Sequence, residues 1–513
     1  MTVATLPVRS RPRAGRTAPG GLARLLRVEL RRNTMPWVLP LIALVFWFDS
    51  YRIAATLPPL WNSRTFYVLG QGHSLIDFAP FVAGVAAWMG SRDGRRGLTD
   101  LVTTSARSRF AAQFATWAAT AIWAVGGYLV FMAATFWALS RSIVWGGPPY
   151  WPVAVGAVGV AAFSAAGFAA GAYFPTRFTA PVAAFGGLLA CGMSSQIGFQ
   201  SYGGWGLILP TNSNNNYGQD AGIFYQFLPD LPVARVMFLA GVTVALVALL
   251  GVRATAGGLR LRHIATVVAA AGAALAVTAI ALAFTARVTS YGTVIPALHD
   301  AANDRPIPYT PVCGQAAGVP VCVQPAYQAY LPDVTAALRP VLGQTDGLPG
   351  VPVRVGQVAT VFFNATGRGP QTSVGQVSTL RGQPPVLSMP LNVFNLPGSF
   401  GANQTQFTDE IKLQAVHAIV TRGGPLGNPA QIAVEAALMQ HAGIPLAAQP
   451  KQVLAPSPWA LPSNEPHPGT TYPRQIAAAA QRFAALPAAT RHAWLTSHLP
   501  ALRAGHVSLA QLP

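Results

Sequence analysis

The chain has 513 residues, of which 52% are hydrophobic and only 10% are charged. Because soluble domains are about one-quarter charged, this composition excludes an ordinary water-soluble globular protein. The net charge of +19 does not indicate a nucleic-acid partner, since the excess lies in the apolar part of the chain. Residues 1–287 hold 22 arginines and 7 acidic residues, whereas residues 288–513 hold 12 basic and 8 acidic residues.

The N-terminal segment is basic and precedes a long apolar run. Residues 1–20, rich in Arg, Pro and Gly, are predicted to form a disordered cytoplasmic tail. Residues 21–35 predict an amphipathic helix in the membrane interface, because four leucines share one helical face and arginines lie largely opposite. The run from Pro36 is too long for a signal peptide and lacks an A-x-A cleavage site, so it is interpreted as a retained first helix.

The apolar segments predict an α-helical polytopic membrane protein with about seven transmembrane helices, since about 20 residues cross the hydrocarbon layer. The range is six to seven, because the second segment is short and contains Asp77. Gly167 and Gly171 have the small-xxx-small spacing that lets helix backbones approach closely, which predicts a packing role. Within a transmembrane domain of residues 36–287, the expected spans are 36–56, 75–90, 111–139, 151–174, 178–199, 232–252 and 263–286.

The distribution of arginines predicts the orientation in the membrane. With the N-terminus in the cytoplasm, 17 arginines of residues 1–287 fall on the inner side and 5 on the outer side. This split predicts a multi-pass protein of the plasma membrane. An odd number of spans then places residues 288–513 outside the cytoplasm.

Residues 288–513 are predicted to form an extracytoplasmic α+β domain. Residues 351–363 alternate with β-branched side chains and indicate one strand or two. Cys313 and Cys322 favour a disulfide in an oxidising compartment, the alternative being two free thiols, and Cys191 is expected to pack inside the fifth span. Short helices are expected at 331–339, 409–421, 429–442, 473–486 and 488–503.

No catalytic or metal-binding motif is present in the sequence. It contains no H-E-x-x-H pair for zinc and no G-x-S-x-G nucleophile elbow. It also lacks the G-x-x-x-x-G-K-[ST] phosphate loop, so the chain is not expected to hydrolyse ATP. We therefore expect a protein that is not an enzyme and that holds no metal and no cofactor of its own.

A basic loop, residues 91–110, separates the second and third spans. Gly94 and Gly97 interrupt the helix, and apolar residues then recur at helical spacing with polar residues between them. Such a segment can bury one face on the membrane domain and offer the other to a protein; the alternative is a loop that only fixes topology. The candidate contact residues are Arg92, Asp93, Arg95, Arg96, Gly97, Leu98, Thr99, Asp100, Leu101, Thr103 and Ser105.

Residues 21–287 resemble the permeases of ABC-2-type transporters. In that family an acidic residue is followed by three residues and then by Gly-Thr-Leu-Glu and Leu, and a small or Thr-rich end precedes a Pro. Here Asp93 precedes Gly97, Leu98-Thr99-Asp100 replaces Thr-Leu-Glu, and Ala106 stands where Pro is usual. The appended outer domain resembles that of some actinobacterial permeases of this type.

The resemblance implies a permease, an exporter, that pairs as a homodimer or heterodimer and is driven by a separate ATP-binding subunit. ATP is then bound by that subunit, which contacts the loop after the second span. Asp49, Arg52 and Asp77 are either an ion-paired outer gate or interfacial residues in contact with water. The alternative function is a membrane-anchored receptor or assembly protein that acts through its outer domain.

Overall fold

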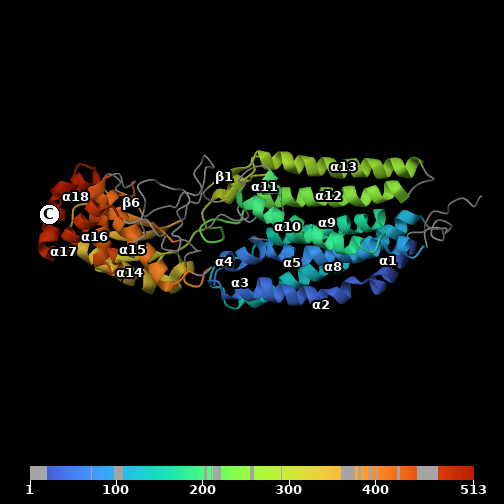
Figure 1. Cartoon of the computed structure of the whole chain (residues 1–513), viewed down its shortest axis with the longest axis horizontal. Helices are drawn as coiled ribbons and strands as arrows, with labels where there is room; N and C mark the ends of the chain where they lie inside the picture. Colours follow the sequence, from blue (N-terminus) through green and yellow to red (C-terminus); the bar gives the residue numbers. More distant parts are fainter. Residues whose placement is uncertain are drawn as a thin grey trace, which may run out of the picture.

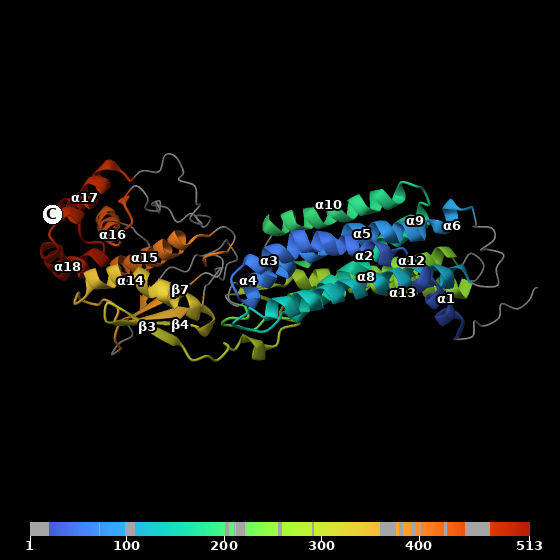
Figure 2. The same cartoon turned by 90° about the horizontal axis from the view of Figure 1, so that it is seen from below.

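The computed structural model consists of an elongated helical bundle and, beyond one end of it, a C-terminal region of residues 287–513 (Figures 1 and 2). The bundle extends from residue 20 to residue 286. The structure describes residues 20–70, 72–97, 108–200, 205–209, 211, 221–254, 259–289, 292–359, 376–378, 383–391, 396–399, 402–424, 428–446 and 472–513.

Helices cover each of the seven segments predicted as spans. The first is continuous through a short π-helical turn, so that α2, η1 and α3 form one rod. Short helices lie at the two ends of the bundle: α1 and α6 at one end, and α4, followed by η2, and α11 at the other. The elements are α1 (Gly20–Arg32), α2 (Met35–Phe46), η1 (Trp47–Tyr51), α3 (Arg52–Thr56), α4 (Trp61–Thr65), η2 (Phe66–Gly70), α5 (His73–Gly90), α6 (Arg92–Arg95), α8 (Arg109–Ser140), α9 (Tyr150–Tyr173), α10 (Thr179–Gln200), α11 (Trp205–Ile208), α12 (Asp230–Ala254) and α13 (Leu259–Phe284).

Five helices in the described part of the chain are long and apolar enough to cross a membrane. The helix α5 is not among them: it has 18 residues and carries the buried Asp77. The apolar part of α10, Thr179–Ser194, is shorter than a full span. The seven-span count therefore stays a prediction. The five are Met35–Thr56, Arg109–Ser140, Tyr150–Tyr173, Asp230–Arg253 and Leu259–Phe284.

Glycine lets α5 and α9 pack backbone against backbone. A Cβ on Gly167 would lie 2.2 Å from the Ala83 carbonyl oxygen, and one on Gly171 would lie 2.1 Å from that of Ala87. Both distances are far inside van der Waals contact, so no larger side chain fits. The packing role predicted from the spacing of these two glycines is confirmed.

A mixed five-stranded sheet, in the order β3-β4-β5-β7-β6, forms one side of the C-terminal region. The two central pairs, β4 with β5 and β5 with β7, are parallel, and the outer pairs β3–β4 and β6–β7 are antiparallel. A separate ribbon of β1 and β2 leads into this region from α13. The strands are β1 (Arg287–Thr289), β2 (Gly292–Val294), β3 (Val312–Ala316), β4 (Val319–Val323), β5 (Arg354–Val358), β6 (Gln376–Ser378) and β7 (Val386–Pro390).

Five helices pack with this sheet and around one another. Three of the predicted helices, α16, α17 and α18, occur within one residue of their expected bounds. The helix α15 begins five residues before its expected start at 409, and α14 continues six residues beyond its expected end at 339. The hairpin of β3 and β4 is not among the elements that the sequence predicts. The helical elements are η3 (Ala301–Asp304), η4 (Pro325–Tyr330), α14 (Leu331–Thr345), α15 (Gln404–Thr421), α16 (Pro429–His441), α17 (Arg474–Ala485), α18 (Ala488–Arg503) and η7 (Leu509–Gln511).

The core of the C-terminal region includes side chains from the loops of the bundle. Leu60, Ile223 and Phe224 belong to the same buried cluster as the sheet and its helices. The Phe224 ring packs edge-on against Tyr309, with 5.6 Å between ring centroids, and its carbonyl oxygen accepts a 2.8 Å hydrogen bond from Ile307 N–H. The bundle and the C-terminal region are thus joined by a shared core.

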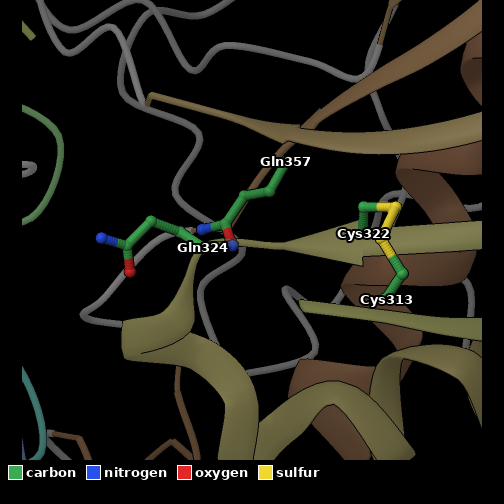
Figure 3. The surroundings of a disulfide bond; sticks show 4 residues. All are labelled: Cys313, Cys322, Gln324 and Gln357. Carbon is green, nitrogen blue, oxygen red and sulfur yellow. A yellow bond between two sulfur atoms is a disulfide. The ribbon is translucent and has the colours of Figure 1, made fainter. Parts of the chain in front are cut away.

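The Cys313–Cys322 disulfide lies across the β3–β4 hairpin, where the two residues face each other in register (Figure 3). Just beyond it, the backbone N–H of Gln324 donates to Gln357 Oε1 at 2.9 Å. The Gln324 side chain donates to the carbonyl oxygen of Ile223 at 3.2 Å. This glutamine therefore ties the sheet to the loop before α12.

Candidate coupling site at the arginine-rich end of the bundle

The end of the bundle far from the C-terminal region carries α1 and α6 (Figures 1 and 2). We call it the arginine-rich end. Its only carboxylates among the described residues are Glu29 and Asp93. Its arginines in the described residues are Arg24, Arg27, Arg31, Arg32, Arg92, Arg95, Arg96, Arg109, Arg177, Arg253, Arg260 and Arg262.

The helix α1 packs on α8 through the face that contains its leucines. Trp123 Nε1 on α8 donates to the Leu30 carbonyl oxygen at 2.9 Å, and Asn33 Nδ2 donates to Thr120 Oγ1 at 2.9 Å. Leu25, Leu26, Glu29 and Leu30 are half-buried, while the arginines of α1 are exposed. The predicted amphipathic helix is therefore present, with much of its leucine face covered by the bundle.

A two-pronged ion pair links α1 to the segment that follows α5. Arg92 Nη1 and Nη2 donate to the two carboxylate oxygens of Glu29 at 3.2 and 3.0 Å, and Arg92 Nε lies 3.6 Å from Asp93. The hydrogen bonds to Glu29 raise the pKa of Arg92 despite its partial burial. A planar guanidinium that binds both oxygens fixes orientation as well as distance, so α1 and α6 are held as one unit.

The two glycines of the loop have different structural roles. A Cβ on Gly94 would lie 2.5 Å from Pro175 Cβ, so α6 lies directly against the turn between α9 and α10. Gly97 has a φ of +65°, a left-handed conformation that glycine adopts readily, and nothing lies within 4 Å of an added Cβ. Five of the predicted contact residues therefore lie at this end of the bundle: Arg92, Asp93, Arg95, Arg96 and Gly97. The other six, Leu98, Thr99, Asp100, Leu101, Thr103 and Ser105, lie outside the described residues.

The predicted ion pair at the opposite end of the bundle is not formed among the described residues. Asp49 instead contacts His73, with 2.9 Å between Oδ2 and Nδ1, and Asp77 accepts a 2.6 Å hydrogen bond from Ser50. Arg52 lies over the Phe48 ring at 5.8 Å. The rod formed by α2, η1 and α3 carries Asp49, Ser50 and Arg52. The helix α5 begins with His73.

A second polar contact, not predicted from the sequence, lies where α12 begins. Asp230 is fully buried and accepts from Ile295 N–H at 3.0 Å, while His299 Nδ1 lies 3.0 Å from the same oxygen. His299 Nε2 lies 3.0 Å from Asp304. Burial lowers the pKa of His299, but the two carboxylates outweigh it and raise the pKa above its ordinary value. This histidine joins α12 to the chain that enters the C-terminal region.

Titratable groups elsewhere do not converge on one point. In the described part of the chain, no three His, Cys, Asp or Glu side chains are arranged so that they could hold a metal ion. At the arginine-rich end, twelve described arginines stand beside two described carboxylates. No protein-family model, no curated protein and no solved structure matches the chain.

Proposed function

We propose that the chain is the membrane-spanning permease subunit of an ABC-type transporter, an exporter driven by a separate ATP-binding subunit. The observation that carries this proposal is the Glu29–Arg92 link between α1 and the start of the loop after α5. A partner that displaces this loop also displaces an interfacial helix packed along α8. The loop is therefore connected to the bundle in the way a coupling device requires.

The five long apolar helices support insertion in a membrane, and the distribution of charge supports one orientation. The arginine-rich end has twelve arginines and two carboxylates among the described residues. Such an excess is typical of the cytoplasmic side of a membrane protein. The N-terminus is then cytoplasmic, and the C-terminal region is extracytoplasmic, where a disulfide between Cys313 and Cys322 is stable.

The motor is supplied by another chain. The sequence contains only two lysines, Lys412 and Lys451, and neither follows a glycine as the lysine of a phosphate loop does. The ATP-binding subunit contacts residues 92–106, and a second permease subunit, identical or related, completes the transporter. ATP binding on the partner moves α1 and α6 together and alters the packing of the bundle.

A receptor or assembly protein that acts through the C-terminal region is the second candidate. The shared core around Leu60, Ile223 and Phe224 favours it, since a ligand bound outside would act directly on the bundle loops. In that case no ATPase accompanies the chain.

The deciding experiment is affinity purification of the tagged full chain in mild detergent from its native cells, with the ATPase activity of the eluate measured. The test variant is Thr99→Arg/Thr103→Arg, which places two bulky charges on the polar side of the predicted loop helix. The matched control is Ser140→Arg/Val144→Arg, two exposed positions at the other end of the bundle. We expect ATPase to accompany the wild type and the control and to be lost from the test variant. An eluate without ATPase for all three would contradict the proposed function.

A further inference from the structure

Three arginines lie on the two segments that meet where α6 packs against the turn between α9 and α10. Arg95 and Arg96 come from the end of α6, and Arg177 comes from the turn, which Gly94 brings into contact through Pro175. We call Arg95, Arg96 and Arg177 the three-arginine cluster. Its members come from two segments far apart in sequence, so the packing of α6 creates it.

One member of the cluster is held rigidly. Arg95 Nε donates to Ser91 Oγ at 3.0 Å, and Nη2 donates to the Trp88 carbonyl oxygen at 3.1 Å. Its guanidinium carbon lies 3.5 Å from the centroid of the Trp88 ring. A cation stacked on an aromatic face and fixed by two hydrogen bonds loses little further freedom when it binds an anion.

The positive charge of the cluster is not balanced within the described residues. Both carboxylates of the arginine-rich end, Glu29 and Asp93, are directed at Arg92. Burial lowers the pKa of Arg95, and the like charges of Arg96 and Arg177 lower it further. An arrangement of this kind is stabilised by an external anion.

Large apolar side chains are exposed on α5 and on the turn that supplies Arg177. Trp88, Phe174 and Phe178 are 45%, 67% and 77% exposed, although each lies at or beside the elements that supply the arginines. Exposed aromatic rings beside arginines are typical of the level at which headgroups meet acyl chains. A soluble anion would make no use of these rings, whereas a phospholipid would cover them with its tails.

We propose that the three-arginine cluster binds the phosphate of an anionic phospholipid, whose acyl chains lie along Trp88 and Phe178. The inference rests on the membrane insertion contained in the proposed function, but not on the ATPase partner. It places the lipid phosphate beside the loop that the partner protein contacts, and Arg177 is the member of the cluster that lies outside this loop. Carboxylates of a partner protein are the competing occupant, and the test distinguishes them.

The test is lipid binding by the delipidated full chain in neutral-detergent micelles, measured by native mass spectrometry during titration with phosphatidylglycerol or phosphatidylcholine. Phosphatidylglycerol should bind the wild type, and the Arg95→Gln/Arg177→Gln variant should bind it about tenfold more weakly. The matched control is Arg260→Gln/Arg262→Gln, which removes the same charge from the same end of the bundle. It should bind as the wild type does. Equal weakening in both variants would mean general attraction to a basic surface and would overturn the proposal.

Two further experiments test whether the bound phosphate belongs to a lipid and whether lipid binding is independent of the ATP-binding subunit. Glycerol 3-phosphate at millimolar concentration should not displace the lipid; displacement would assign the site to soluble phosphate esters. Arg177→Gln, a single change outside residues 92–106, should weaken lipid binding and still co-purify with ATPase. Loss of ATPase with unchanged lipid binding in this variant would assign the cluster to the partner protein. If the double variant is misfolded by size-exclusion chromatography, Arg177→Gln alone serves, because this side chain is exposed.

Discussion

His417 and Glu435 form a buried pair between α15 and α16 in the C-terminal region. Their side chains approach to 3.1 Å between Nδ1 and Oε2, and the residues are only 4% and 3% exposed. Burial lowers the pKa of His417, but the hydrogen bond and charge of Glu435 outweigh this effect and raise the pKa above its ordinary value. The protonated histidine is therefore stabilised in the folded chain relative to the unfolded chain.

The pair predicts a specific pH dependence of stability. Because the pKa of His417 is raised on folding, its contribution is complete below about pH 6.5 and is lost as the pH rises through the folded pKa. His417→Ala should cost about 3–5 kcal/mol near neutral pH, since Glu435 is left buried without its partner. Thermal unfolding at pH 6 and pH 9 measures both effects. The double variant His417→Leu/Glu435→Leu should be less destabilised than His417→Ala. It should also lack the part of the decrease in stability between pH 6 and pH 9 that is due to His417. An identical pH profile in the wild type and the double variant would contradict this account.

Ala317 occupies a backbone conformation that alanine rarely adopts. It has a φ of +50°, and Gly318 beside it has a φ of +81°, so the two residues form the turn between β3 and β4. The left-handed region costs a residue with a Cβ about 1–2 kcal/mol, and asparagine tolerates it better. Ala317→Asn should raise the free energy of unfolding by up to about 1 kcal/mol, measured by chemical denaturation. Ala337→Asn inside α14 is the opposing control and should destabilise, because Ala337 is buried.

At the scale of elements, the contact between α5 and α9 depends on glycine. Gly171→Leu places a side chain where the Ala87 carbonyl oxygen now lies, and should lower stability by about 3 kcal/mol or more. Gly126→Leu on α8 is the matched control, because nothing lies within 4 Å of a Cβ at that position. Heating in detergent followed by size-exclusion chromatography measures the difference. Equal midpoints for the two variants would show that close backbone packing is not what holds these helices together.

The sequence predicts the helices of the bundle well and the sheet poorly, for physical reasons. An apolar run of about 20 residues has few structural solutions other than a helix, so the helix bounds follow from composition. The β3–β4 hairpin lacks an Asn-Gly turn and carries Gly314 and Pro320 within its strands, so no local signal identifies it. Its two cysteines predict a disulfide between strands that periodicity does not reveal.

The sequence locates the loop of the candidate site, but it does not predict which distant residues this loop contacts. Glycines and arginines locate the loop in the sequence, but its link to α1 joins Arg92 to Glu29 across 63 residues. Sequence proximity suggests Arg52 as a partner of Asp49, although the contact of Asp49 is His73 from the next long helix. Charge and spacing identify which residues are unusual, whereas packing decides which of them meet.

At the scale of the whole molecule, the shared core makes the C-terminal region dependent on the bundle loops. Phe224→Ala removes a buried ring from this core and should destabilise the C-terminal region by about 3–5 kcal/mol. Protease protection of that region during heating measures the effect. Phe185→Ala is the matched control, since the Phe185 ring on α10 is 61% exposed and lies outside the buried clusters. Equal protection in wild type and Phe224→Ala would show that the two parts are stable independently.

The shared core also dictates an order of assembly. Leu60 and Phe224 are synthesised long before the strands and helices that they pack against, because the chain is made from its N-terminus. The C-terminal region therefore completes its core with side chains that are already present when its own strands and helices are made. Folding of residues 287–513 thus depends on prior placement of the loops that carry Leu60 and Phe224.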